Sequence, residues 1–169
     1  LPNVDKEAVL EKCSEFFYID EKEGTDTMEE DLKKLYDEGK KAFGFYCGKG
    51  EWFLLTLKNI DFMSQMLPDV SKASQSLDVS VLHTLILEKI FGIDKENMAK
   101  QINLTYTKFF TEAIDGVDKG EFQCSFVLNP TRVTEIRDVA AAGEKMPQKS
   151  TYFYPKMITG MVMNNLGVD

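Results

Sequence analysis

Two β-rich runs separated by a glycine-rich turn constrain the fold of this chain more than any other feature. The runs cover residues 42 to 47 and 52 to 58, and Gly48-Lys49-Gly50-Glu51 joins them. A short loop with glycines between two runs of aromatic and aliphatic residues is typical of a β-hairpin. We therefore predict an antiparallel pair of strands here, around which a sheet can be built.

Periodic patterns before the hairpin predict helices. Residues 5 to 17 carry apolar side chains at helical spacing, and residues 17 to 21 can continue as an edge strand. Thr27 and Glu30 have the spacing of a capping box, so a second helix should begin there. Gly39 stands where a left-handed residue would end that helix.

The second half of the chain alternates between helical and strand patterns. Residues 60 to 76 hold little periodic signal and are expected to be a connector, whereas Asp78 should cap a buried helix that runs to Phe91. The elements expected after it are a strand at 102–106, a helix at 110–117, a strand at 122–128, a helix from Pro130 to Gly143, and strands at 151–154 and 157–164.

This order predicts the α+β (mixed α/β) fold class. A single sheet of about five to seven strands would be layered with helices. The length of 169 residues suits one α/β domain over residues 1–169, with a weak internal boundary near residues 60–76.

The charge of the chain excludes some classes of partner. Asp and Glu outnumber Lys and Arg by 28 to 20, and the resulting net charge of −8 repels nucleic acid and anionic membranes. No apolar run approaches the ~20 residues that span a bilayer, and no signal peptide is recognisable. We therefore expect a cytoplasmic protein with neither nucleic acid nor membrane as a partner.

The residues that most often bind metals are sparse. Cys13, Cys47 and Cys124 lack the spacing of a zinc site or a disulfide framework and are expected to be small apolar core residues. His83, the single histidine, lies in the most apolar helix, where packing is the simpler role and a general base the alternative. We predict no metal site, and no catalytic residue can be assigned.

The densest group of functional side chains is the Met146–Lys156 block, with the sequence M-P-Q-K-S-T-Y-F-Y-P-K. Amines beside hydroxyls can hold an anion, and the two prolines restrict the backbone. Five basic and three acidic residues lie between residues 131 and 160, a net charge of +2 within an acidic chain. The residues predicted to bind a small anionic ligand are Lys149, Ser150, Thr151, Lys156 and Arg132.

Two other interpretations of this block must be weighed. Gly143 to Ser150 has nearly the spacing of a phosphate-binding P-loop, but Gln148 replaces the second glycine and a helix precedes the segment where a strand is required. We reject that motif. The alternative that remains is structural: the aromatic residues would form a strand, and the domain would serve folding or self-association, for example as a homodimer.

Several segments resemble a known family of prokaryotic proteins, domain-of-unknown-function family 1015. The similarity covers about residues 77 to 166 and corresponds to the C-terminal part of the family. The matching segments are 77–82, 90–94, 142–144, 146–156 and Thr159-Gly160, and the pattern M-P-x-K-S-T-x-F-x-P-K is the most specific of them.

The resemblance implies a longer protein. Family members look about twice as long, and their N-terminal part carries an Asp-Gly-His-His-Arg motif similar to the nucleotide-using fold of ParB-like proteins. This chain lacks that motif. The expected partner is thus the protein's own N-terminal domain, which would complete the anion site and could bring a nucleotide. The chain itself is expected to need no cofactor and to be inert alone.

Overall fold

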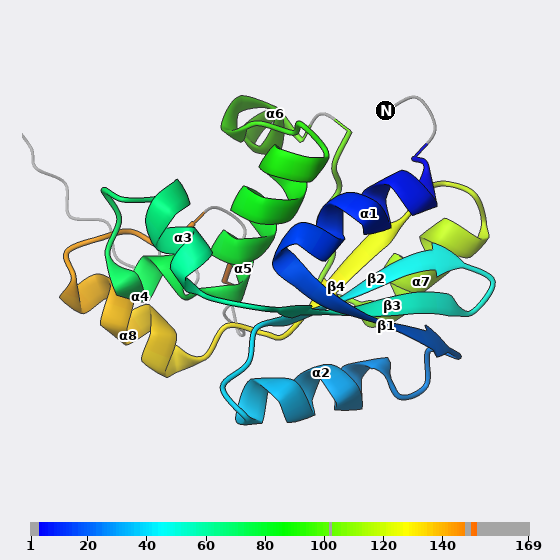
Figure 1. Cartoon of the computed structure of the whole chain (residues 1–169), viewed down its shortest axis with the longest axis horizontal. Helices are drawn as coiled ribbons and strands as arrows, with labels where there is room; N and C mark the ends of the chain where they lie inside the picture. The colour runs from blue at the N-terminus through cyan, green and yellow to red at the C-terminus, as the bar shows by residue number, and fades with distance from the viewer. Residues whose placement is uncertain (1–3, 102, 148–149, 152–169) are drawn as a thin grey trace, which may run out of the picture.

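The computed structural model describes residues 4–101, 103–147 and 150–151. These residues form both helices and strands (Figure 1). In chain order they are α1 (Lys6–Phe16), β1 (Phe17–Glu23), α2 (Met28–Asp37), β2 (Ala42–Gly48), β3 (Glu51–Leu57), α3 (Asp61–Met66), α4 (Lys72–Gln75), α5 (Asp78–Val81), the π-helix η1 (Leu82–Ile90), α6 (Lys95–Lys100), α7 (Phe110–Asp118), β4 (Ser125–Leu128) and α8 (Val133–Ala141).

The strands form one antiparallel sheet in the order β1-β3-β2-β4. The hairpin β2–β3 lies at its centre, as the glycine-rich turn predicted, and β1 is an edge strand of the described sheet. Phe45 is opposite Phe53 on one side and Phe126 on the other, so three aromatic residues lie side by side across the sheet. The α+β fold class is confirmed.

The expected number of strands is wrong for the part of the chain that the structure describes, which holds four instead of about five to seven. Of the strand expected at residues 102–106, the described part, 103–106, is not a strand. Leu104 packs against the core beneath η1, and Tyr106 packs against His83. The alternating apolar side chains of this segment therefore contact a helix and not a neighbouring strand. The strands expected at 151–154 and 157–164 lie outside the described residues, apart from Thr151.

Helices cover both faces of the sheet. α1 and η1 pack on one face, where they bury Phe43 and Phe45. α2 and α7 pack on the opposite face around Tyr46 and Trp52. Figure 1 shows α1 above and α2 below the twisted sheet, and this three-layer arrangement leaves each face of β2 almost fully buried.

A third group of helices gathers at one end of the sheet (Figure 1). α3, α4 and α8 pack there, and Leu77, Val79 and Val139 form a small separate core. Residues 60–76, expected to be an irregular connector, thus contain two short helices. Ser74 and Gln75 of α4 are buried, and the Gln75 amide donates to the carbonyls of Leu67 and Val70 at 2.8 Å each.

The helix ends follow the sequence signals in part. Gly39 adopts a left-handed φ of 77° after α2, as predicted. The capping box at Thr27 is wrong, because its hydroxyl reaches the Asp31 carboxylate at 3.4 Å instead of a backbone N–H. α8 begins at Val133 and not at Pro130: Arg132 is its N-cap, with its backbone N–H donating to the Glu135 carboxylate at 2.9 Å, and the buried side chain of Asn129 instead donates to the carbonyl of Leu32 at 3.0 Å.

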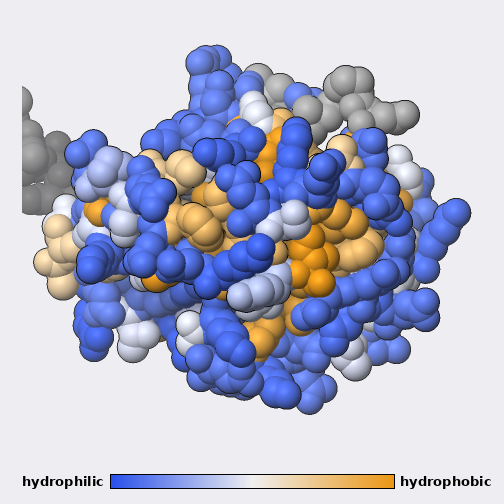
Figure 2. Space-filling view, in the orientation of Figure 1, coloured by the Kyte–Doolittle hydropathy of each residue, from blue (hydrophilic) through white to orange (hydrophobic). Residues whose placement is uncertain are grey.

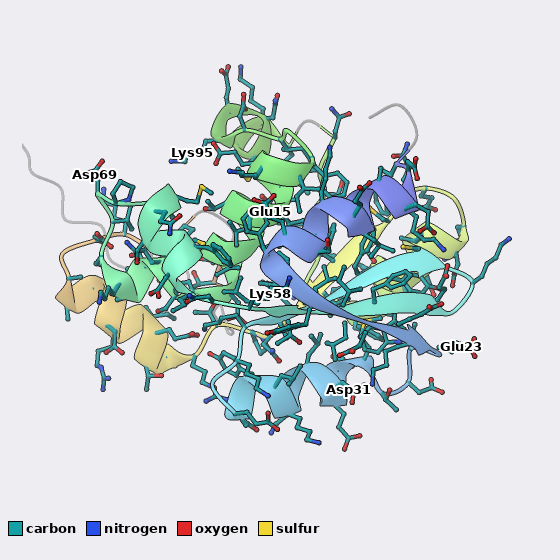
Figure 3. The ribbon with its side chains drawn as sticks, viewed as in Figure 1. Glu15, Glu23, Asp31, Lys58, Asp69 and Lys95 are labelled. Carbon is teal, nitrogen blue, oxygen red and sulfur yellow. The ribbon has the colours of Figure 1, made fainter. Side chains whose placement is uncertain are left out.

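Charged residues lie mainly on the outside of this structure. Glu15, Glu23, Asp69 and Lys95, which Figure 3 labels, come from four separate parts of the fold, and all four are exposed. Within the described part of the chain, no helix has the length and apolar character needed to cross a bilayer.

Candidate functional site

The five residues predicted to bind an anion fall partly within the described structure. Arg132 is the residue that precedes α8, and Ser150 and Thr151 end the described chain. Lys149 and Lys156 lie outside the described residues.

A hydrogen bond between two loops brings Ser150 next to the start of α8. The hydroxyl of Thr131 donates to the Ser150 carbonyl at 2.9 Å, which joins residues 19 positions apart. The Ser150 hydroxyl donates to the Pro147 carbonyl at 2.6 Å. Ser150 and Arg132, which the sequence analysis grouped together, are thus neighbours in space.

The Met146–Ser150 segment is also held at its beginning. Met146 packs against the small core of Leu77 and Val139, below α8 and α5. Just before it, the Glu144 carboxylate accepts hydrogen bonds from the Ser71 N–H at 2.7 Å and the Ser71 hydroxyl at 2.6 Å, and a third from the Ser74 hydroxyl. These donors hold the pKa of Glu144 below its usual range. The loop between these two anchors is therefore short and fixed at both ends.

Arg132 is already paired. Its guanidinium lies over the ring of Tyr36, with 3.9 Å between the guanidinium carbon and the ring centroid, and it bonds the carboxylate of Asp37. Hydrogen bonds from Lys33 and then from Arg132 lower the pKa of Asp37. Because stacking and the carboxylate occupy this side chain, Arg132 is better placed to position α8 against α2 than to hold a free anion.

A partly buried charge cluster, which the sequence analysis missed, lies beside this loop. Lys41 is 2.8 Å from Asp78 Oδ1 and 3.5 Å from Glu135 Oε1. The Tyr36 hydroxyl donates to Glu135 Oε2 at 2.6 Å, and the backbone N–H of Arg132 donates to the same oxygen at 2.9 Å. The cluster joins four segments: α2, the start of β2, α5 and α8.

Asp78 is the most buried member of this cluster, with 7% of its surface exposed. The sequence predicted Asp78 to cap the following helix, but Leu77 is the capping residue and Asp78 is the first residue inside α5. Lys41 makes an ion pair with Asp78, yet neither carboxylate oxygen has a well-aligned hydrogen-bond donor among the described residues. Burial raises the pKa of Asp78, and the charge of Lys41 offsets part of that rise.

The same environment affects Tyr36. Burial, and next the hydrogen bond to Glu135, raises the pKa of its phenol, so it remains a neutral donor. The cluster therefore contains two cations and three carboxylates, counting Asp37, and both cations are paired. It is suited to fixing four segments together, and any anion must be bound by groups outside it.

His83 lies in η1, away from this cluster. Its ring is 6.3 Å from that of Tyr106, and its buried Nε2 has no hydrogen-bond partner among the described residues. Burial lowers the pKa of His83 and favours the neutral imidazole. No group of three or more His, Cys, Asp or Glu residues in the described ranges is placed to bind a metal ion.

Comparisons with known proteins find no relative of this chain. Neither the protein-family models, nor the curated proteins, nor the solved structures contain a match to the chain. The resemblance to family 1015 and the functional roles that it implies remain predictions from the sequence.

Proposed function

We propose that this domain binds a small anionic ligand, such as phosphate or a phosphorylated metabolite, through the loop at residues 146–151. The hydrogen bond from Thr131 to the Ser150 carbonyl is the observation that carries the proposal, because it holds one residue of the predicted site, Ser150, beside the start of α8. Lys149 is the amine expected to contact the anion, with Thr151 as a hydroxyl donor and Lys156 as a further cation. Ser150 would donate as well only if its hydroxyl turned from the Pro147 carbonyl to the anion.

Two properties of the loop support this assignment. Its anchors at Glu144 and Ser150 restrict the backbone before a ligand arrives, which reduces the entropy lost on binding. Its own stretch of the sequence is positively charged, with a net +2 over residues 131–160 against −8 for the whole chain. Local positive charge on an acidic protein attracts a small anion but disfavours a polyanion.

Arg132 has a different role in this proposal from the one expected from the sequence. Its pairing with Asp37 and Tyr36 orients the first turn of α8, and it acts on the ligand through that turn. The remaining donors come from the loop itself and, as the resemblance implies, from an N-terminal domain of a longer cytoplasmic protein. The binding domain would then have no activity of its own.

Calorimetric titration with phosphate, phosphoserine, serine and ATP tests the proposal. A charge-assisted hydrogen bond is worth about 1.5–3 kcal/mol, so Lys149→Ala should weaken binding about tenfold or more. Lys145→Ala is the matched control, because Lys145 is an exposed amine in the same basic segment. Equal losses in both variants would indicate a diffuse charge effect, and no loss in Lys149→Ala would refute the assignment.

Self-association is the second candidate, and edge strand β1 is the observation that favours it. Tyr18 on this strand is 62% exposed, and apolar side chains reach the surface between α1 and α2 on the face shown in Figure 2. An edge strand can pair with a second copy of itself. Asp20, Glu21 and Glu23 on the same strand oppose such pairing by like-charge repulsion. Sedimentation of the wild type and of Tyr18→Lys tests self-association. The wild type should sediment as a dimer and Tyr18→Lys as a monomer, and any other result would exclude pairing through β1.

A further inference from the structure

We propose that Cys47 and Cys124 form a cross-strand thiol pair that can be oxidised reversibly to a disulfide between β2 and the start of β4. The three cysteines are free thiols in the structure. The proposal rests on the register of the two strands, on the face that both side chains share, and on their partial exposure.

The register places the two cysteines opposite each other. Phe45 is paired with Phe126, and Tyr46 with Ser125, in the antiparallel ladder of β2 and β4. The ladder ends at this pair, and its continuation by one residue would set Cys47 opposite Cys124, at the position where a β-bulge interrupts the pairing of β2 with β3. Residues opposite each other in antiparallel strands have Cα atoms about 4.5–5.5 Å apart, which lies within the range of about 4.4–6.8 Å found for disulfides.

Both side chains point to the same face of the sheet. The rings of Phe45 and Phe126 are stacked on that face with centroids 4.8 Å apart. Side chains alternate between the faces of a regular strand, but β2 has a bulge at Cys47 in its pairing with β3, so the face of Cys47 is assigned from its contacts. Both cysteines pack against the core beneath α1 and η1, which confirms that they share this face.

The two thiols are close enough to influence each other, and reagents can reach them. Burial raises the pKa of Cys47 to about 12, and the neighbouring Cys124 contributes to that rise. Both cysteines are partly exposed, whereas Cys13 is fully buried. Cys47 also lines a surface hollow of about 320 Å³ together with Gly48, Lys49, Glu51, Val117 and Asp118. The pair should therefore react slowly at neutral pH and faster under alkaline conditions.

The oxidant would be a low-molecular-weight disulfide such as oxidised glutathione. The Cys47 thiolate attacks one sulfur of the reagent, its S–S bond breaks, and one reagent thiolate leaves. The Cys124 thiolate then attacks the Cys47 sulfur of the mixed disulfide and releases the second reagent thiolate. The two protons lost by the cysteines end on the two reagent thiols, and the two electrons lost by the protein reduce the reagent. An excess of dithiothreitol reverses both steps.

Peptide mapping of the native wild-type chain tests the pairing. After incubation with oxidised glutathione at pH 8.5 and quenching with acid, the intact mass should fall by two hydrogen atoms, and one cross-linked peptide should join Cys47 to Cys124. Cys13 should remain free for alkylation after denaturation. Glutathione adducts without a protein disulfide, or a disulfide that includes Cys13, would overturn the proposal.

A second measurement does not depend on mapping. Closing a long loop by a disulfide should raise the melting temperature of the oxidised wild type by about 5–15 °C, and dithiothreitol should remove the increase. Cys124→Ser should instead accumulate a glutathione adduct at Cys47 and show no such increase. Cys13→Ala should behave as the wild type on oxidation, and an increase that requires Cys13 would count against the cross-strand pair.

Discussion

The Lys41 ammonium lies 2.8 Å from the Asp78 carboxylate and connects the start of β2 to the first turn of α5. Only 16% of the Lys41 side chain is exposed, so water screens this ion pair poorly. The pair also reaches Glu135 of α8, and a single amine therefore connects the sheet to the end of the molecule where the 146–151 loop is anchored.

Removing the Lys41 amine should strongly destabilise the fold at neutral pH. Lys41→Met leaves Asp78 buried without a counter-ion, and breaking such a pair costs about 3–5 kcal/mol. Urea unfolding at pH 7 measures this cost, and Lys40→Met serves as control because Lys40 is an exposed residue whose ion pair is with exposed Glu38. The double variant Lys41→Met/Asp78→Leu should recover much of the loss, and a double variant as unstable as the sum of its single substitutions would contradict the assignment.

The pH dependence of this variant has a defined sign. The pKa of Asp78 is raised in the folded state above its ordinary value of 3.8, so the native protein holds that proton more tightly than the unfolded chain. The penalty for the charged carboxylate is then absent below that ordinary value and grows as the pH rises through the folded pKa. Lys41→Met should thus lose less stability, relative to wild type, at pH 4 than at pH 7.

Glu144 should have the opposite pH dependence. Hydrogen bonds from Ser71 and Ser74 lower its pKa below the ordinary value of 4.5, so the unfolded chain binds the proton more tightly. The stability that Glu144 provides is present above that ordinary value and is lost as the pH falls through the folded pKa. Between pH 5 and pH 3, Glu144→Gln should show a shallower decline in urea midpoint than wild type. Glu11→Gln, on the exposed side of α1, should decline as wild type does.

Gly44 in β2 provides a test of packing between the sheet and α2. A Cβ atom at this position would lie 2.8 Å from the Met28 sulfur, and Met28 is fully buried. Gly44→Ala should therefore cost about 1–3 kcal/mol of unfolding free energy from overpacking. The cost should shrink in a Met28→Ala background, where the space has been opened, and an additive double-mutant cycle would exclude this explanation.

Gly116→Ala is the matched comparison. Its Cβ would lie 2.5 Å from the Phe122 ring, an even closer approach. Phe122 is 41% exposed and can swing away into solvent, however. The smaller loss is thus expected at Gly116, despite the shorter distance, and a larger loss there would show that the Phe122 ring is held in place.

The hydroxyl of Tyr46 should stabilise the β2–β3 turn. It donates to the Asp118 carboxylate at 2.7 Å and accepts from the Gly50 N–H at 3.0 Å, while the Lys49 N–H donates to the same carboxylate at 2.9 Å. Tyr46→Phe breaks two of these bonds within a buried residue and should lower the melting temperature. Tyr18→Phe, at an exposed position of β1, should leave it unchanged, and equal effects of both would rule out this role.

The sequence was sufficient to predict those elements whose signals are local. The hairpin, α1, α7 and the left-handed Gly39 follow from nearby residues and their spacing, and the structure confirms them. Residues 102–106 show where such signals fail. Alternating apolar residues indicate that one side of a segment is buried, but not whether a strand or a helix covers that side. Here the covering element is η1, because Tyr106 lies against His83.

The charge cluster could not be predicted for a related reason. An Asp that precedes an apolar run has the same local pattern whether it caps a helix or pairs with a distant cation. Its partner Lys41 comes from a segment 37 positions earlier in the chain, and only the tertiary fold brings the two side chains together. The proximity of Arg132 to Ser150 likewise depends on the Thr131 hydroxyl, which the sequence alone did not single out.

The strand order β1-β3-β2-β4 also has a consequence for how the chain is made. The central hairpin is complete once Leu57 has left the ribosome, but β4, which covers the free edge of β2, begins only at Ser125. During synthesis of the intervening residues, the edge of β2 and the ring of Phe45 lack the partner that Phe126 later provides. A strand edge without its partner is a template for aggregation. We therefore expect nascent chains shorter than about 125 residues to depend on chaperones, whereas chains that include β4 can bury this edge by themselves.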